Sequence, residues 1–474
     1  MNLRAGLRRW AWLALLALIA DSARAELPSA VSQALRQAGI PESHVGIVVQ
    51  EIGNPIPLLA HGEKRSFNPA SVMKLVTTLV ALDSLGPAYT FKTRVYADGP
   101  IVEGVLRGNL ILQGGGDPVL TLERFWQLLR ELRERGVREI RGDVLLDGRY
   151  YQLDPIDPGA FDQSPLRPYN APPSALLVNF NTLNLRLKTV DGALSARLDP
   201  PQLDASPALI NLARISDAPC NGWREKIAPQ VENNHLVLSG SFSSACGEQS
   251  MPLNLLSPEA TLAAVFGAIW KDLGGIHGGQ VLPVRGGTEL AGNAPLQLLL
   301  EFDSPPLSQQ VRDINKFSNN VMAKMLFLNL GAARFGAPAT WDKGERAVRG
   351  WFKERGLEMP ELVLENGSGL SRIERISAAS LTSLLSYAAA SPAYYEFAAS
   401  LPAVGLEGTQ KGRMPDAMTL GAAWLKSGTL NGARNLAGYT LGRNGARRIL
   451  VMLINHANAA AGAKAQEALT AWAM

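Results

Sequence analysis

The residues with the clearest chemical potential fall into three short patterns: Ser71-Val72-Met73-Lys74, Ser318-Asn319-Asn320 and Lys426-Ser427-Gly428. Residues three apart on a helix lie on one face, so the Lys74 amine can reach the Ser71 hydroxyl. A serine in the first helical turn also lies where unpaired backbone N–H groups favour developing negative charge. Burial beside other cations lowers the pKa of a lysine toward neutrality, and a neutral amine can take the serine proton. The first pattern therefore predicts a serine nucleophile with a lysine base.

Each pattern alone is a weak signal, since Ser-x-x-Lys is expected about once or twice by chance in a chain of 474 residues. The other interpretation of the first pattern is a helix-start serine beside a solvated lysine. The five histidines show no nucleophile-elbow or zinc-ligand spacing, and the sequence contains no HExxH, GxxxxGKS/T or CxxC. A Ser-His-Asp assembly from distant histidines stays open, without any spacing to indicate it. No cofactor or metal is expected.

The elements around these patterns must bring them together. Residues 44–51 (HVGIVVQE) predict a strand, with a second short strand around Leu58. Asn68 suits an N-cap and Pro69 a first helical position, and the helix that follows is apolar on nearly all sides and ends at Gly86. Such a helix is typical of a buried, central position. The first pattern therefore opens a core helix.

The second and third patterns also have characteristic surroundings. The second interrupts a helical stretch over residues 311–330. The third lies on the first of three strand candidates, WLKSGTL, RNLAGYTL and RRILVMLIN, which are joined through Asn431-Gly432 and Asn444-Gly445. Asn-Gly is a strong hairpin signal, so these strands predict an antiparallel meander, followed by a terminal helix over residues 457–473.

A long region of different texture separates the first two patterns. From about residue 91 to residue 284, short strand-like runs surround two predicted helices, over residues 121–135 and 258–273. A Pro-rich connection over residues 154–173 divides the region. This alternation predicts an inserted α/β region of one or two subdomains.

The first 25 residues have the pattern of an export signal. Three arginines precede an apolar run from Trp10 to Ala20, and Ala23-Arg24-Ala25 gives a small-x-small cleavage site. The run is about half as long as a bilayer span, so a membrane anchor is the weaker interpretation, and no later segment predicts a stable anchor. Without this segment the net charge falls from +4 to about +1, and no nucleic-acid partner is expected.

Cys220 and Cys246 are the two cysteines of the sequence. In an exported protein such a pair is typical of one disulfide, with two separate buried thiols as the alternative. Closing a loop of about 27 residues would stabilise the fold by roughly 3 kcal/mol. In both interpretations the pair is structural rather than catalytic.

In their order, Ser-x-x-Lys, Ser-x-Asn and Lys-Thr/Ser-Gly resemble the three motifs of the penicillin-binding proteins and serine β-lactamases. The separation of about 240 residues between Lys74 and Ser318 is similar to that in the class C D-alanyl-D-alanine carboxypeptidase/endopeptidases of the penicillin-binding protein 4 type. Further stretches share this resemblance: GGDP at 115–118, DSPPL at 303–307, NGSGLSR at 366–372 and NLAG at 435–438. The resemblance covers nearly the whole chain after the leader.

The resemblance implies a multi-domain α/β fold. A β-lactamase/transpeptidase-like domain, with an antiparallel sheet flanked by helices, would consist of residues 26–90 and 293–474. A large inserted α/β region over residues 91–292 would interrupt it. Residues 1–25 would be a cleaved signal peptide, which implies a periplasmic protein.

The resemblance also implies a catalytic role for residues of all three motifs. Ser71 would attack the carbonyl of the penultimate D-Ala, with Lys74 as its base. Ser318 would pass a proton to the leaving amine, and Lys426 would polarise the site. The backbone N–H groups of Ser71 and Thr429 would form the oxyanion hole, typically worth about 3 kcal/mol per donor.

The remaining residues of the motifs are implied to bind the substrate. The Asn320 amide would hold the substrate backbone. The strand that contains Gly428 would offer its edge to an extended peptide, and the hydroxyls of Ser427 and Thr429 would receive the terminal carboxylate. Each of these groups would act on the backbone or the terminal carboxylate of the peptide.

Asp117 and Arg372 resemble the family's contacts to the diaminopimelate branch of the stem peptide. A carboxylate facing the free amine and an arginine facing the carboxylate would be complementary to that branch. The other interpretations are a glycine turn for the sequence around Asp117 and a surface loop for that around Arg372.

Two positions depart from the commoner pattern of these relatives. Asn319 stands where the second motif more often has aspartate, and its side chain is expected to face away from the substrate. Ser427 replaces the commoner threonine and keeps the hydroxyl. Neither change removes a functional group that the chemistry needs.

The implied function is that of a serine-type D-Ala-D-Ala carboxypeptidase that also cleaves peptidoglycan cross-links as a D,D-endopeptidase. It would form an acyl-enzyme on Ser71 and be acylated by β-lactams, with peptidoglycan stem peptides and cross-links as its partners. A β-lactamase is one alternative, but it needs a further base for deacylation, for which the sequence offers no clear glutamate or tyrosine. A penicillin-binding sensor or wall-binding module without turnover is the other, and Ser318 and Asn320 favour turnover over it.

Overall fold

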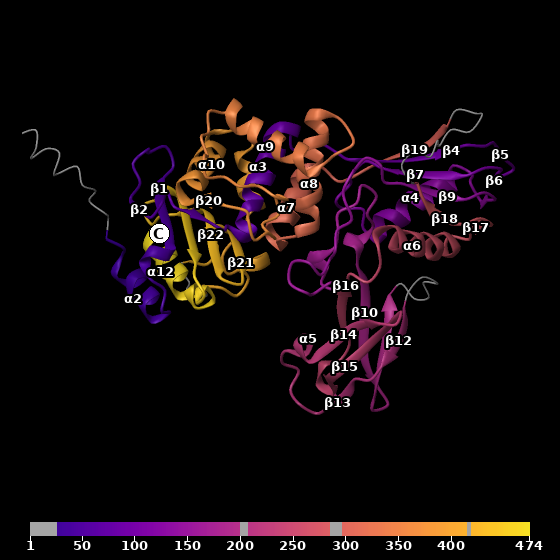
Figure 1. Ribbon diagram of the computed structural model, residues 1–474, viewed down its shortest axis with the longest axis horizontal. Helices are drawn as coiled ribbons and strands as arrows, with labels where there is room; N and C mark the ends of the chain where they lie inside the picture. The colour runs from indigo at the N-terminus through magenta and orange to yellow at the C-terminus, as the bar shows by residue number, and fades with distance from the viewer. Residues whose placement is uncertain (1–25, 200–206, 285–295, 415–418) are drawn as a thin grey trace, which may run out of the picture.

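The structure is a computed structural model that describes residues 26–199, 207–284, 296–414 and 419–474. The expected signal peptide and the expected domain limit at residues 292–293 lie outside the described residues. The described chain forms three bodies with separate hydrophobic cores (Figure 1). Within these residues, no helix has both the length and the apolar character that crossing a membrane requires.

The first body is built around a five-stranded antiparallel sheet with the order β2-β1-β23-β22-β21. The expected meander is confirmed, because β21 pairs with β22 and β22 pairs with β23. Strand β1 pairs with β23 along its whole length, so the two ends of the chain share one sheet. The five strands are β1 (Val45–Glu51), β2 (Leu59–His61), β21 (Ala423–Leu430), β22 (Ala433–Leu441) and β23 (Arg447–Asn455).

Alternate residues of this sheet face two different cores. On β23, Met452 and its alternate neighbours face the core that contains helices α2 (Ser29–Gln37) and α12 (Ala463–Ala473). Val451 and its alternate neighbours face the larger core on the other side of the sheet. The helices there are α3 (Lys74–Leu85), α7 (Leu307–Phe317), α8 (Asn320–Phe335), α9 (Trp341–Glu354), α10 (Ala378–Ala390) and α11 (Tyr394–Ser400), beside the short pair β3 (Ser66–Phe67) and β20 (Ile376–Ser377).

The segment that contains Ser71 differs from a simple α-helix. Residues Ala70–Met73 form a 3-10 turn, η2, which continues into α3 at Lys74. The expected α-helical start is therefore about one turn too early, although the Asn68 Oδ1 does accept the Ala70 N–H at 2.9 Å. The expected burial of this helix is confirmed over most of its length, and the helix ends, as expected, at Gly86.

The second body belongs to the inserted region. Its five-stranded sheet has the order β18-β9-β7-β4-β19 and lies beside a smaller sheet with the order β17-β8-β6-β5. Helices α4 (Leu122–Glu134) and α6 (Pro258–Asp272) pack on these strands in one core. Because β19 pairs with β4, this sheet includes residues that follow the expected limit of the insertion. The strands are β4 (Lys92–Ala97), β5 (Ile101–Val102), β6 (Val105–Leu106), β7 (Leu110–Gly114), β8 (Glu139–Ile140), β9 (Val144–Asp147), β17 (Ile276–His277), β18 (Val281–Pro283) and β19 (Gln297–Asp303).

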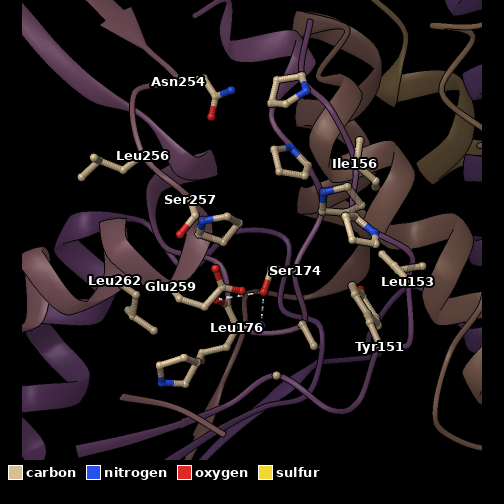
Figure 2. A pocket seen from close by; sticks show the side chains of 18 of the residues that line it. Tyr151, Leu153, Ile156, Ser174, Leu176, Asn254, Leu256, Ser257, Glu259 and Leu262 are labelled. Atoms are coloured by element: carbon tan, nitrogen blue, oxygen red, sulfur yellow. Dashed lines mark hydrogen bonds between the residues drawn. The ribbon is translucent and has the colours of Figure 1, made fainter. Parts of the chain in front are cut away.

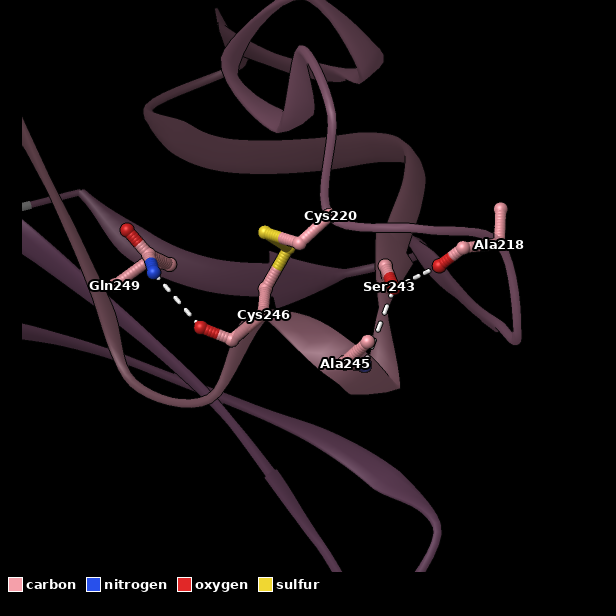
Figure 3. Close-up of a disulfide and its surroundings, with 6 residues drawn as sticks. All are labelled: Ala218, Cys220, Ser243, Ala245, Cys246 and Gln249. Carbon is pink, nitrogen blue, oxygen red and sulfur yellow. Dashed lines mark hydrogen bonds between the residues drawn. A yellow bond between two sulfur atoms is a disulfide. The ribbon is translucent and has the colours of Figure 1, made fainter.

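The third body is a smaller group of sheets around its own core. Strand β10 pairs with β11 and β16, and β15 pairs with β12, β13 and β14. The expected disulfide between Cys220 and Cys246 is confirmed (Figure 3), and the alternative of two separate thiols is excluded. The elements are β10 (Leu183–Val190), β11 (Ala193–Asp199), β12 (Ala208–Asn211), β13 (Arg214–Ser216), α5 (Trp223–Lys226), β14 (Ile227–Glu232), β15 (His235–Ser243) and β16 (Gln249–Leu253).

Candidate active site

Ser71 lies on the turn η2, and Lys74 begins α3 directly after it. The turn places the Lys74 Nζ 3.0 Å from the Ser71 Oγ. The same amine donates to the Asn320 Oδ1 at 2.5 Å and to the backbone carbonyl of Ser368. The Lys74 side chain is fully buried, whereas Ser71 is partly exposed. The hydroxyl that could act as a nucleophile is therefore reachable, and its basic neighbour is shielded from water.

The break between α7 and α8 presents the second motif. Ser318 ends α7 with a φ of 58°, which is uncommon for a residue with a side chain. Asn319 caps α8, because its Oδ1 accepts the Met322 N–H at 3.1 Å. Asn320 begins α8 and is buried, with its amide oxygen on the Lys74 amine. The interruption expected from the sequence thus brings two polar side chains to the serine.

The third motif joins this cluster through Lys426. Its amine donates to the Ser318 Oγ at 2.9 Å and to the Ser427 backbone carbonyl at 2.7 Å. The Lys426 side chain is fully buried, like that of Lys74. The structure therefore brings Ser71, Lys74, Ser318, Asn320 and Lys426 together from three distant segments of the chain.

Gly428 explains how the strand β21 comes so close to the serine. A Cβ at this position would lie 2.5 Å from the Pro69 carbonyl oxygen and 2.9 Å from the Ser71 N. Real Cβ atoms do not come this close to backbone atoms, so only glycine permits this packing of β21 on η2. The glycine of the third motif thus sets the distance between the strand and the nucleophile.

Burial governs the charge of the lysines. It lowers the pKa of Lys426 to about 7. Burial also lowers the pKa of Lys74 well below its usual value, and the nearby charge of Lys426 lowers it further. Glu374 raises the pKa of Lys74, whereas Lys324 lowers it. A neutral lysine amine is therefore accessible near neutral pH, and this is the form that can accept a proton.

The hydroxyl groups of the third motif lie on the accessible side of β21. The Ser427 Oγ donates to the Thr409 Oγ1 at 3.1 Å, and Thr429 is exposed. Because side chains alternate along a strand, these two point away from the buried side of Lys426 and Gly428. Thr409 was not expected from the sequence, because its contact depends on a loop that packs beside the strand only in the folded chain.

Asp117 and Arg372 lie apart from this hydrogen-bonded cluster. Asp117 is 2% exposed; its Oδ1 accepts the Val119 N–H at 2.9 Å, and its Oδ2 has no partner among the described residues. Burial raises the pKa of this carboxyl to about 6. Arg372 is exposed, with its guanidinium 4.3 Å from the centre of the Phe161 ring. Neither residue lines the cavity at Ser71.

A cavity of about 1200 Å³ opens at Ser71. The second motif forms one part of its wall, together with Phe317, which is 66% exposed. Another part comes from the inserted region, where residues 163–169 and most of residues 224–232 line the same space. No local sequence pattern distinguishes these two segments, so the sequence could not identify them.

A second cavity, of about 770 Å³, lies between strands and loops of the two inserted bodies. Figure 2 looks into it and shows Tyr151, Ile156 and Leu262 among its apolar residues, with the Ser174 hydroxyl nearby. Several prolines complete its wall. It contains none of the motif residues, and among the described residues no group of acidic, histidine or cysteine side chains could hold a metal ion.

Solved structures with the same architecture are known. The structure is similar to penicillin binding protein 4 (dacB) from Haemophilus influenzae, with a TM-score of 0.77 and 24% identity over 94% of this chain and 98% of that one. It also resembles the Bd3459 predatory endopeptidase from Bdellovibrio bacteriovorus, with a TM-score of 0.51 and 14% identity over 90% and 92% of the two chains. The expected multi-domain α/β fold, with a β-lactamase/transpeptidase-like domain, is confirmed.

Sequence relatives cover most of the chain. It is 28% identical over 436 residues to a D-alanyl-D-alanine carboxypeptidase of Actinomadura sp. (strain R39), which is 89% of this chain and 79% of that protein. It is 26% identical over 426 residues to the D-alanyl-D-alanine carboxypeptidase DacB of Haemophilus influenzae, which is 88% of this chain and 86% of that protein. A family model matches residues 27–474. The chain belongs to the D-Ala-D-Ala carboxypeptidase 3 (S13) family.

Proposed function

We propose that this protein is a serine-type D-Ala-D-Ala carboxypeptidase that also opens peptidoglycan cross-links as a D,D-endopeptidase. One observation carries the proposal: the Ser71 hydroxyl meets the Lys74 amine at 3.0 Å, and the Lys426 amine meets the Ser318 hydroxyl at 2.9 Å. The first pair supplies a nucleophile with a base, and the second supplies a hydroxyl that can transfer a proton. Membership of the S13 family supports the substrate class.

The first half of the reaction is acylation. The neutral Lys74 amine takes the proton of Ser71, whose oxygen attacks the carbonyl carbon of the penultimate D-Ala. The backbone N–H groups of Ser71 and Thr429 receive the developing oxyanion. Ser318, held by the Lys426 amine, relays the proton that Lys74 took to the departing amine nitrogen, and the C–N bond breaks. Terminal D-Ala, or the cross-linked strand, leaves as an amine.

The second half is deacylation by water, which regenerates the Ser71 hydroxyl and releases the shortened peptide. The acyl group stays on Ser71 while the Asn320 amide holds the peptide backbone beside it. The same serine would open a β-lactam ring, so we also propose that β-lactams acylate the protein. A solved structure of the Haemophilus influenzae relative contains a novel β-lactam, which supports this part of the proposal.

Substrate recognition is proposed for both ends of the peptide. The hydroxyls of Ser427 and Thr429 receive the terminal carboxylate beside the strand edge at Gly428. Arg372 and Asp117 contact the carboxylate and the amine of the diaminopimelate branch. The exposure of Arg372 supports the first contact. The Asp117 Oδ2 has no partner among the described residues, but the side chain is buried and must become accessible before it can reach the amine.

We also propose a domain organisation for the chain and a location for the protein in the cell. We take residues 26–90 and the chain after β19 as the catalytic domain, because β19 completes the inserted sheet by pairing with β4. The insertion then extends through β19, beyond the limit at residue 292 that the sequence predicts. The disulfide Cys220–Cys246 and the leader pattern support export to the periplasm.

The test uses purified protein without the leader, beside Ser71→Ala. Both are incubated with a peptide that ends in D-Ala-D-Ala and with cross-linked muropeptide dimers, and the products are separated by mass. We expect D-Ala and monomers from the wild type and neither from Ser71→Ala. Absence of both products from the wild type would overturn the proposal. Rapid turnover of a labelled penicillin would instead favour a β-lactamase, and acylation without any peptide release would favour a sensor.

A further inference from the structure

Glu374 is a fully buried carboxylate close to the catalytic cluster that the proposed reaction does not use. Its Oε1 accepts three backbone N–H groups, from Glu365 at 3.2 Å, Asn366 at 3.0 Å and Gly367 at 2.9 Å. Its Oε2 has no partner among the described residues. Three backbone donors converging on one oxygen are typical of a site that holds an anion. The loop 365–374 is therefore folded around its own carboxylate.

This loop contacts the elements that carry the nucleophile and the base. Its Ser368 carbonyl accepts the Lys74 amine, and its Gly367 carbonyl accepts the Thr77 hydroxyl at 2.6 Å. A Cβ at Gly369 would lie 2.7 Å from the Ser71 N, so the loop backbone packs directly on the turn η2. A change in the shape of the loop would thus move an acceptor of the Lys74 amine.

Charges around Lys74 come from several elements. Burial lowers the pKa of Lys74 most strongly. The charges of Lys426 and Lys324 lower it further, whereas the charge of Glu374 raises it. Lys324 is buried on α8, where burial lowers its pKa to about 8 while Glu365 and Glu374 act against this. Burial raises the pKa of Glu374, the backbone N–H donors lower it, and Glu365 raises it. A negative charge at Glu374 therefore opposes the loss of protons from two neighbouring lysines.

We propose that Glu374 is a positioning residue for the reaction at Ser71: its carboxylate shapes the loop that holds the Lys74 amine and supplies a buried negative charge in the surroundings of Lys74 and Lys324. The inference rests on the proposed roles of Ser71 and Lys74. It goes beyond them, because it gives a buried carboxylate outside the three motifs a part in positioning the base.

The test follows the rate of Ser71 acylation by a fluorescent penicillin as a function of pH, in the full mature protein. Glu374→Gln keeps an oxygen acceptor for the loop but removes the charge. The Lys74 amine then loses its proton more readily, so the acid limb of the profile moves to lower pH by about 1 unit. The plateau rate falls by about tenfold, because a less basic Lys74 amine is a weaker acceptor of the serine proton. A role confined to packing would lower the plateau and leave the limb in place.

Three further variants separate charge from shape. Glu365→Gln is the matched control, since Glu365 is an exposed member of the same loop, and its profile should follow the wild type within about 0.3 unit. Lys324→Met removes a cation that lowers the pKa of Lys74, so its limb should move to higher pH. Glu374→Asp keeps the charge but cannot reach all three N–H groups. Its plateau rate of acylation should therefore fall, without a comparable shift of the acid limb in pH.

The outcomes distinguish this inference from the function on which it rests. If wild type takes no label, or if Ser71→Ala takes label equally well, the proposed function fails. If wild type is labelled at Ser71 and the Glu374→Gln and Glu365→Gln profiles both follow it, the inference about Glu374 alone fails. Should Glu374→Gln not fold, as judged by its near-UV circular dichroism, Glu374→Asp still tests how the carboxylate shapes the loop, and a plateau equal to that of the wild type contradicts the inference.

Discussion

Two lysine amines, those of Lys74 and Lys426, are fully buried around a serine that is partly exposed. Among the described residues, each amine donates only to uncharged oxygens: hydroxyls, an amide and backbone carbonyls. Removing an ammonium from water without a bound carboxylate is unfavourable, and the pKa falls as a result. The same burial that makes a lysine useful as a base therefore destabilises the fold.

Lys426→Met tests this conflict between stability and activity. At pH 7 we expect the variant to be more stable: its free energy of unfolding should exceed that of the wild type by about 1–3 kcal/mol, because an apolar side chain fills the buried space. Acylation of Ser71 should fall by about 1000-fold or more, since the contact with Ser318 is lost. Denaturant titration and penicillin labelling measure the two effects. A destabilised variant, or one that acylates normally, would contradict the account.

The stability difference should also depend on pH in one direction. The folded-state pKa of Lys426 is about 7, and that of the unfolded chain is near the ordinary 10.5. Between these values the unfolded chain binds more protons, so the wild type gains stability as the pH rises. The advantage of Lys426→Met should therefore shrink from pH 7 toward pH 10.5. A constant difference would contradict the burial of this amine.

Among the structural elements, the contact between β21 and η2 depends on a single glycine. Gly428→Ala would place a Cβ 2.5 Å from the Pro69 carbonyl oxygen. We expect the strand to move away from Ser71 and the acylation rate to fall by about 100-fold, with the circular dichroism spectrum unchanged. Gly267→Ala is the control: it lies in α6, and a Cβ there meets nothing within 4 Å. Equal activities of the two variants would contradict the argument.

The start of α8 offers a second test of how an element positions the site. Asn319→Ala removes the N-cap and should lower the free energy of unfolding by about 1 kcal/mol. It should also reduce the acylation rate, because Asn320 follows directly and holds the Lys74 amine. Asn319→Asp keeps the capping oxygen and should match the wild type in thermal unfolding. If both variants unfold alike, the cap has no importance here.

Elements with strong local signals could be predicted from the sequence. The meander around Asn431-Gly432 and the break at Ser318 follow from turn chemistry and periodicity, and both are confirmed. The 3-10 form of the turn at Ser71 was missed, because α and 3-10 starts share the same cap residues. The contacts of Thr409 and Glu374 were also missed, because both lie in loops whose shape no periodic pattern in the sequence indicates.

At the scale of the whole molecule, the three bodies have separate cores, and the motif residues lie in the first of them. The disulfide lies in the third (Figure 3). Replacing Cys220 and Cys246 by serine should destabilise that body by about 3 kcal/mol. Acylation of Ser71 by a small penicillin should stay within about twofold of the wild type. Hydrogen exchange and labelling measure these effects, and loss of labelling would mean that the bodies are coupled.

The arrangement of the bodies could not be predicted from the sequence. The composition and the Pro-rich connection indicate an insertion, but the pairing of β19 with β4 joins strands about 200 residues apart. The cavity at Ser71 also depends on segments that are distant in sequence, because residues in 163–169 and 224–232 form part of its wall. Such contacts arise from packing between bodies, which leaves no periodic pattern in either segment.

The proposed reaction depends on a covalent acyl-enzyme at Ser71. Its most direct measurement is the intact mass of the mature protein after brief exposure to benzylpenicillin, followed by peptide mapping. We predict one added penicilloyl group, located on Ser71 and absent from Ser71→Ala. An unmodified wild-type protein, or a modification on any other residue, would contradict the account.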